Sequence, residues 1–283
     1  MSKLTSLEEA VRRFVPDGCT VVLGAGLEAL IPFACGYEIV RQKRRGLTLV
    51  APISDMLFDV LIGAGAVERV IAAWVGNVSE GSGHNFRRAV EHSEPNRIQV
   101  VDHSNLTLAL ALHAAALGVP YLPARTALGT DLLASNPHVQ PMVCPFTGDR
   151  LVGVEALRPD VAVLAVQRAD VEGNAHVIGN LGVVKDAARA AGTVVLLAEE
   201  IVASEVIREE PNRTLVPGFL VSAVVHAPRG CHPSPCYGYY DRDHEFFHHY
   251  HAVSRTREGF LAWLDEWVLS VSDHEDYLRR LSG

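Results

Sequence analysis

Apolar residues along the chain gather into short runs that alternate with segments of helical length. The runs are rich in Val, Ile, Leu and Ala without polar alternation, and they occupy residues 20–26, 47–52, 69–76, 98–102, 161–167 and 193–202. Such runs are typical of strands buried on both faces, as in a parallel sheet covered by helices. Helix candidates lie between them, at residues 31–45, 55–65, 106–118 and 180–192. This order predicts an α/β fold with an open, mainly parallel sheet flanked by helices.

The chain has no evident internal boundary. It contains no internal repeat, no low-complexity segment and no linker rich in Gly or Ser. We therefore expect one domain over residues 1–283, with residues 242–283 as a C-terminal helical extension. In open α/β sheets, ligands bind at the loops that follow the carboxyl ends of the strands. The loops after the first four runs, at residues 24–32, 51–55, 74–85 and 102–107, are the expected place for a site.

Composition narrows the class of protein. Of the 283 residues, 48% are hydrophobic and 20% are charged, as in a soluble globular protein. The formal net charge of -8 argues against nucleic acid as a partner, because phosphates need clustered Lys and Arg. The weakly polar stretch from Leu106 is interrupted by His113 and Gly118, so we expect no membrane span. An odd number of cysteines, five, and an N-terminus without an apolar signal segment predict reduced thiols in the cytoplasm.

Two of the expected loops carry residues suited to an anion. Gly24 and Gly26 allow close backbone approach, and their N–H groups suit an oxyanion, although a tight turn without ligand is the alternative. The third glycine of G-x-G-x-x-G is missing, which disfavours a dinucleotide site. In DHSNLT, a side chain of Asp102, Ser104 or Asn105 either caps the following helix or helps to bind a carboxylate or thioester oxygen. The chain shows neither a P-loop nor a G-x-S-x-G motif, and no complete catalytic set.

The segment HEFFH, residues 244–248, matches the H-E-x-x-H pattern of zinc proteases. On a helix, His244 and His248 share one face, and Glu245 could serve as a base. The longer zinc-protease pattern fails, because His251 stands where a glycine belongs and Ser254 where the third histidine belongs. The aromatic residues beside the histidines fit a packing face. The preferred interpretation is a segment without metal, with a zinc hydrolase or a structural metal as alternatives.

Longer segments resemble a known family. PDGCTVVLGAGLEALIPFACGYEIVRQKRRGLTLV near the start, RPDVAVLAVQRADVEGNAHVIGN from Arg158 and AARAAGTVVLLAEEIV from Ala187 resemble the α (A) subunits of family I CoA-transferases. FTGDRLV from Phe146 and SAVVHAPRGCHPSPCYGYYDRDHEFF from Ser222 look most like the branch that contains the α (A) subunits of glutaconate and 3-oxoadipate CoA-transferases. The resemblance covers nearly the whole chain.

The resemblance implies an α/β fold of the CoA-transferase (NagB-like) type, a coenzyme A thioester as substrate and no permanently bound cofactor. It also implies a separate β subunit, in an α2β2 assembly. In such enzymes a glutamate of the β chain attacks the acyl-CoA, forms a mixed anhydride and then a glutamyl-CoA thioester, and passes CoA to a carboxylic acid. No catalytic residue is therefore expected with certainty in this chain. Residues at matching positions, which would bind substrate or CoA or stabilise an oxyanion, are Gly24, Gly26, Ser54, Trp74, Gly76, Asn77, Ser104 and Asn105.

The expected function is that of a CoA-transferase α subunit. It would move CoA from a donor such as succinyl-CoA to a short carboxylic or dicarboxylic acid, with 3-oxoadipate, an intermediate of aromatic compound catabolism, as the first candidate and glutaconate-like acids next. One alternative is an acyl-CoA hydrolase, acting on a ring or a thioester, since a divergent branch of the family carries an acidic residue where this chain has Asn105. An amide cannot act as a general base, so that alternative requires Asp102 in the role. Another alternative is a non-catalytic binding subunit.

Overall fold

The computed structural model describes residues 2–282, and its centre is a large open sheet. The main path of this sheet is β1-β15-β13-β11-β2-β3-β4-β7, and every neighbouring pair along it runs parallel. In chain order these strands are β1 (Leu4–Thr5), β2 (Thr20–Leu23), β3 (Leu47–Ile53), β4 (Val67–Trp74), β7 (Gln99–Asp102), β11 (Val161–Ala169), β13 (Thr193–Ile201) and β15 (Val221–His226). Two short strands, β12 (Ala175–His176) and β14 (Thr214–Val216), add antiparallel pairings. The predicted open, mainly parallel sheet is confirmed.

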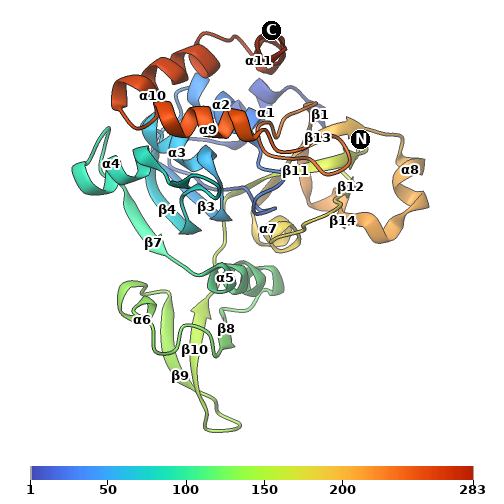
Figure 1. The fold of residues 1–283 in the computed structure, drawn as a ribbon. Coiled ribbons are helices and arrows are strands. Elements are labelled where there is room, and N and C mark those ends of the chain that lie inside the picture. Colours follow the sequence, from blue (N-terminus) through green and yellow to red (C-terminus); the bar gives the residue numbers. More distant parts are fainter. Residues whose placement is uncertain (1, 283) are drawn as a thin grey trace.

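Helices cover both faces of the sheet (Figure 1). On one face, α5 (Asn105–Leu117) packs against α7 (Val184–Ala190). The other face carries α1, α2 and α3, and α9, α10 and α11 lie over them. The bounds of these and the remaining helices are α1 (Leu7–Phe14), α2 (Phe33–Arg41), α3 (Met56–Gly63), α4 (His84–His92), α6 (Leu132–Ser135), α8 (Ser204–Glu209), α9 (His244–Val253), α10 (Arg257–Leu264) and α11 (His274–Leu281). Short helical turns occupy η1 (Pro211–Arg213), η2 (Gly218–Leu220) and η3 (Asp265–Leu269).

The C-terminal helices bury the outer side of α2. Phe247 of α9 meets the ring of Phe33 at a centroid distance of 6.2 Å, and Tyr37 meets Trp263 of α10 at 6.2 Å and Tyr277 of α11 at 5.5 Å. Residues 33–40 of α2 are consequently all buried, although α2 lies in the layer next to the sheet, where one side of a helix would otherwise face solvent. A helix that is apolar around most of its circumference needs such cover on two sides. The predicted C-terminal helical extension is therefore part of the packed core.

A small antiparallel sheet projects beyond α5 (Figure 1). Its strands, in spatial order, are β8 (Tyr121–Ala124), β10 (Arg150–Glu155) and β9 (Val139–Val143). We call residues 121–155 the arm. Ala111 of α5 forms a separate small hydrophobic cluster with Val139, Val152 and Val154 of the arm. The apolar pattern of the sequence predicts no element between residues 119 and 160, so the arm is an addition to the expected fold.

Two properties bear on the expected environment of the protein. Among residues 2–282, no helix combines the length and the apolar character needed to cross a membrane. The cysteines at positions 19, 35, 144, 231 and 236 are all free thiols. Burial raises the pKa of the Cys19 thiol to about 11, so this buried thiol stays protonated at neutral pH.

Candidate active site at the carboxyl edge

The residues singled out in the sequence lie along one edge of the main sheet. Gly24 follows β2, Ser54 follows β3, Trp74 ends β4 and Ser104 comes shortly after β7. These four strands are neighbours in the order β2-β3-β4-β7 and run parallel, so their carboxyl ends meet at the same edge. We call it the carboxyl edge. Because neighbouring strands are about 4.8 Å apart, β2 and β7 are separated by roughly 14 Å, and the residues fall into two groups.

The glycine loop after β2 is held in place by other loops. A Cβ on Gly24, whose φ is +91°, would lie 3.0 Å from the carbonyl oxygen of Ile53, and one on Gly26 would lie 2.5 Å from that of Ala29. The strand order of the main sheet reverses between β2 and β11. From the far side of this point, the backbone N–H of Val183 donates to the carbonyl of Ala25 at 2.8 Å. Glycine is thus required at both positions by close backbone approach. The structure therefore favours the tight turn of the two interpretations. This turn lies where the strand order reverses, which is where open α/β sheets bind ligands.

The turn after β3 is strained and buried. Ser54 and Asp55 are both completely buried, and Asp55 has φ of 52° and ψ of -138°, a conformation nearly reserved for glycine. Burial raises the pKa of Asp55 to about 6, against the opposing effect of Arg242. The Oγ of Ser54 has no hydrogen-bond partner within the described part of the chain. Strain and unpaired buried polar groups of this kind concentrate at functional sites.

Arg242 connects this turn to the segment after β4. Its Nη1 lies 2.6 Å from Oδ2 of Asp55, an ion pair without the linear geometry of a hydrogen bond, and its Nη2 donates to Oδ1 of Asn77 at 3.4 Å. The guanidinium carbon lies 3.8 Å from the ring centroid of Phe247. Only 11% of the Arg242 side chain is exposed. A polar cluster of Ser54, Asp55, Asn77 and Arg242 therefore lies at the carboxyl ends of β3 and β4.

The loop after β4 forms a hairpin. Gly76 and Asn77 form β5 (Gly76–Asn77), which pairs with β6 (Gly81–Ser82). The side-chain oxygen of Asn77 accepts hydrogen bonds from the backbone N–H groups of Ser79 at 2.9 Å and Glu80 at 3.3 Å. The Nδ2 of Asn77 is buried and has no partner among residues 2–282. Trp74, at the end of β4, is 41% exposed and forms the open side of this part of the edge.

The segment after β7 forms the second group. Ser104 is the N-cap of α5, with its Oγ accepting from the backbone N–H of Thr107 at 3.1 Å, and the Thr107 side chain completes a capping box. Asn105 is the first residue of the helix and is exposed. Of the two interpretations of this segment, the structure shows the cap. Burial lowers the pKa of the neighbouring His103 to about 4, so this imidazole is neutral near pH 7.

The HEFFH segment forms the start of α9. His244 and His248 are exposed, whereas Phe246, Phe247 and Tyr250 are buried in the helix packing. His248 lies 3.2 Å from Glu80. Within residues 2–282, no group of three or more His, Cys, Asp or Glu side chains is arranged to hold a metal ion. The aromatic packing face inferred from the sequence is confirmed.

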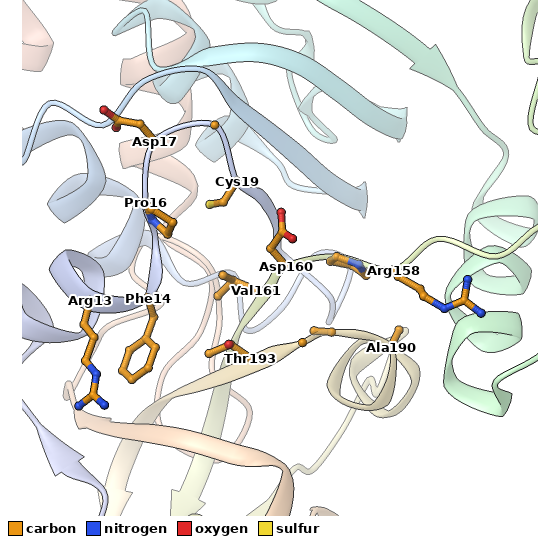
Figure 2. Close-up of a pocket in the computed structure, with 14 residues that line it drawn as sticks. Arg13, Phe14, Pro16, Asp17, Cys19, Arg158, Asp160, Val161, Ala190 and Thr193 are labelled. Atoms are coloured by element: carbon orange, nitrogen blue, oxygen red, sulfur yellow. The ribbon is translucent and has the colours of Figure 1, made fainter.

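A large cavity lies at the opposite edge of the sheet. It has a volume of about 810 Å³ and is lined by the amino ends of β2, β11 and β13, together with the end of α1. Figure 2 shows Arg13 and Arg158 on opposite sides of it, with Asp160 beside the start of β2. Ser54, Trp74 and Asn77 take no part in this cavity. Ligands of open α/β sheets bind at carboxyl ends, so we place the candidate site at the carboxyl edge rather than here.

Asp55 and Arg242 are the two residues of the polar cluster that the sequence does not reveal as a pair. They are separated by 187 positions, and neither belongs to a recognisable motif. Asp55 follows an apolar run directly, which is a weak signal for the end of a strand. Arg242 lies next to HEFFH, whose histidines match a known pattern, whereas the arginine itself belongs to none.

Known proteins are similar to this chain over its whole length. The α (A) chain of 3-oxoadipate CoA-transferase from Pseudomonas knackmussii is 41% identical over 282 residues, which cover 100% of this chain and 99% of that one. The α (A) chain of glutaconate CoA-transferase from Acidaminococcus fermentans is 34% identical over 299 residues, covering 100% and 93%. The crystal structure of the Acidaminococcus enzyme matches with a TM-score of 0.94, at 33% identity and the same coverage. A cholesterol ring-cleaving hydrolase IpdA subunit of Mycobacterium tuberculosis is 29% identical over 276 residues, covering 94% and 93%.

The fold and the carboxyl edge define an open α/β enzyme subunit that offers buried hydrogen-bond donors at its candidate site but no motif for a nucleophile. Residues 4–227 match the family described as Coenzyme A transferase. The chain belongs to this family, as the α (A) subunit of a family I CoA-transferase. Members of the family use coenzyme A thioesters as substrates, and its α subunits imply a partner β (B) subunit.

Proposed function

We propose that this chain, together with a separate β subunit, transfers CoA from an acyl-CoA donor such as succinyl-CoA to a short carboxylic or dicarboxylic acid, with 3-oxoadipate as the first candidate and glutaconate-like acids next. The observation that carries the proposal is the 41% identity to the α chain of a 3-oxoadipate CoA-transferase across practically the full length of both chains. The glutaconate enzyme, at 34% identity, supports the reaction type and widens the range of acceptor acids.

The proposed chemistry is double displacement on a glutamate of the β subunit. That glutamate attacks the thioester, the CoA thiolate leaves, and a mixed anhydride forms; the thiolate then attacks the glutamyl carbonyl and releases the first acid. The acceptor carboxylate then attacks the glutamyl-CoA thioester, which releases the CoA thiolate and forms a second mixed anhydride. The thiolate attacks the acceptor carbonyl of this anhydride, forms the new acyl-CoA and releases the glutamate. Each tetrahedral intermediate carries a negative oxygen that needs fixed donors. On this chain the glycine loop after β2 and the polar cluster at β3 and β4 are the groups proposed to supply them, with the β subunit facing the carboxyl edge in an α2β2 assembly.

The test is transfer by the reconstituted complex. The chain is co-expressed with the product of the neighbouring reading frame, and the purified complex is incubated with succinyl-CoA and, separately, 3-oxoadipate, glutaconate or acetate. Formation of the new acyl-CoA, with a glutamyl-CoA adduct detected by mass on the β chain, is the expected result. A complex that forms no acyl-CoA with any of these acids, and carries no adduct, contradicts the proposal.

Hydrolysis is the second candidate function, favoured by the 29% identity to a cholesterol ring-cleaving hydrolase subunit. It requires an acid or base on this chain near α5. Asn105 cannot supply one, and Asp102 lies exposed at the end of β7, where its backbone carbonyl accepts from Asn136 at 2.7 Å. The same assay detects thioester hydrolysis, because that reaction releases free CoA without an acceptor acid. Ring opening leaves the thioester intact, so it is tested separately with a cyclic acyl-CoA, whose mass would increase by one water. We expect CoA release without acceptor to remain a minor side reaction.

A further inference from the structure

Arg242 lies beyond residues 4–227, the part of the chain that matches the Coenzyme A transferase family model, although individual relatives are similar over the whole chain. It stands between the CHPSPC segment and α9, so the C-terminal extension carries it to the carboxyl edge. There it contacts Asp55 at 2.6 Å and Asn77 at 3.4 Å, while its guanidinium lies on the ring of Phe247. Contacts on three sides fix one position for the planar group, which a flexible surface arginine would not have.

The contact with Asn77 adds to the hydrogen bonds that decide which end of its amide is free. The amide oxygen already accepts from two backbone N–H groups, of Ser79 and Glu80, and Arg242 adds a third donor. Turning the amide over would set its NH₂ group against all three donors. The Nδ2 of Asn77 is therefore held as a donor without an acceptor among the described residues, and a buried donor left unpaired is destabilising.

The contact with Asp55 stabilises the turn that carries the second donor. Asp55 lies in the strained turn that also carries Ser54, whose buried Oγ has no partner in the described chain. Burial raises the pKa of Asp55, and the charge of Glu28 acts in the same direction, while Arg242 is the group that opposes them. Without Arg242, the turn would hold a buried carboxylate with no counter-ion, next to an unfavourable backbone conformation.

We propose that Arg242 is a positioning residue of the active site: through Asp55 and Asn77 it holds Ser54 Oγ and Asn77 Nδ2 as two fixed donors for the oxygen of the reacting acyl group. The inference rests on the proposed function, since it needs an acyl oxygen that becomes negative during the reaction. Arg242 itself does not touch the substrate. Its 11% exposure and its two contacts place it behind the donors.

The test compares variants of the complex with the β subunit. Arg242→Gln removes the charge and both contacts, and displaced donors lower kcat by about 100-fold while KM changes little, because the donors act mainly on the oxyanion. Arg242→Lys keeps the charge but loses the planar fork, so it regains only part of kcat. The matched control is Arg257→Gln. Arg257 also belongs to the extension, donates to the carbonyl of Gly63 and lies 5.4 Å from the ring of Phe260, but it has no contact with the polar cluster.

A double variant separates positioning from stability. Asp55→Asn in the Arg242→Gln background removes the unpaired buried carboxylate, so it restores the unfolding midpoint but leaves kcat low. Recovery of kcat in parallel with stability, or a kcat of Arg242→Gln equal to that of Arg257→Gln per mole of folded complex, overturns the inference and leaves the proposed function intact. If the wild-type and Arg257→Gln complexes both fail to transfer CoA, the proposed function and the inference fall together.

Discussion

At the scale of the residue, Gly76 has a very crowded environment at the carboxyl edge. Its φ is +148°, and a Cβ there would lie 2.4 Å from the carbonyl oxygen of Gly81 and 2.7 Å from the backbone N of Gly83. Both neighbours are backbone atoms, which cannot move aside as a flexible side chain can. The hairpin that presents Asn77 therefore closes only because position 76 lacks a side chain.

We expect Gly76→Ala to destabilise the protein by more than the about 1–3 kcal/mol of backbone strain alone, and to reduce transfer by displacing Asn77. Gly81→Ala is the matched control, because Gly81 has a φ of +117° but nothing within 4 Å of its Cβ position. Urea unfolding of both variants measures the difference between strain alone and strain with a backbone clash. Equal midpoints for the two variants would contradict this account of the hairpin.

Only part of the site is accessible from the sequence, and the residues show why. Gly24, Ser54 and Asn77 follow apolar runs, so a parallel sheet brings them to one edge once the strands are recognised. The sequence leaves two interpretations open for Ser104, because a cap and a ligand donor use the same residue types at a helix N-terminus. The pair of Asp55 and Arg242 depends on the path of the chain after β15, which no local pattern encodes.

At the scale of the element, the helices of the extension begin at well-defined caps. Asp243 caps α9, with its Oδ1 accepting from the backbone N–H of Phe246 at 2.9 Å, and its Oδ2 lies 3.0 Å from Nε2 of the buried His232. Burial acts to raise the pKa of Asp243, but these hydrogen bonds and the charge of His232 outweigh it, and the pKa lies below its usual value. Thr256 caps α10 through the N–H of Gly259 without such a partner.

Asp243→Ala should destabilise the protein by about 0.5–2 kcal/mol at neutral pH. The carboxylate has a lowered pKa in the folded state, so its contribution is present above about pH 4 and is lost as the pH falls below that value. Thr256→Ala should show a similar loss that does not change over the same pH range. Denaturant titrations of both variants and the wild type between about pH 3 and pH 7 check this; a pH-independent loss for Asp243→Ala would contradict the role of its charge.

The strands of the main sheet and those of the arm differ in how visible they are in a sequence. The six apolar runs all form strands of the main sheet, because burial on both faces demands unbroken apolar residues. In the arm, Pro123 interrupts β8, Pro141 interrupts β9 and Gly153 lies within β10. Proline is tolerated in the edge strands β8 and β9, and glycine in the central strand β10, but both weaken the pattern that marks a strand. The sequence therefore predicts six strands of the main sheet, but neither its remaining strands, β1, β12, β14 and β15, nor the arm.

At the scale of the whole molecule, the extension and the arm relate differently to the core. The extension covers α2 and contributes fully buried side chains, among them Phe247, Phe260 and Tyr277. The tip of the arm, residues 144–149, faces solvent, and its Phe146 is 94% exposed. Removing the extension should unfold the protein, and removing the tip of the arm should leave the fold intact.

We expect deletion of residues 242–283 to abolish cooperative unfolding. Each large apolar side chain contributes about 1.5–3 kcal/mol when fully buried, so loss of the aromatic layer, together with exposure of Phe33 and Tyr37, is comparable to a net stability of about 5–15 kcal/mol. The control replaces residues 145–148 at the arm tip with Asn-Gly, a turn that suits an antiparallel hairpin. Near-ultraviolet circular dichroism and thermal unfolding of both proteins distinguish the cases. A truncated chain with a sharp transition close to that of the wild type would show that the chain up to residue 241 folds without the extension. The burial of α2 by α9, α10 and α11 would then not determine the stability of the molecule.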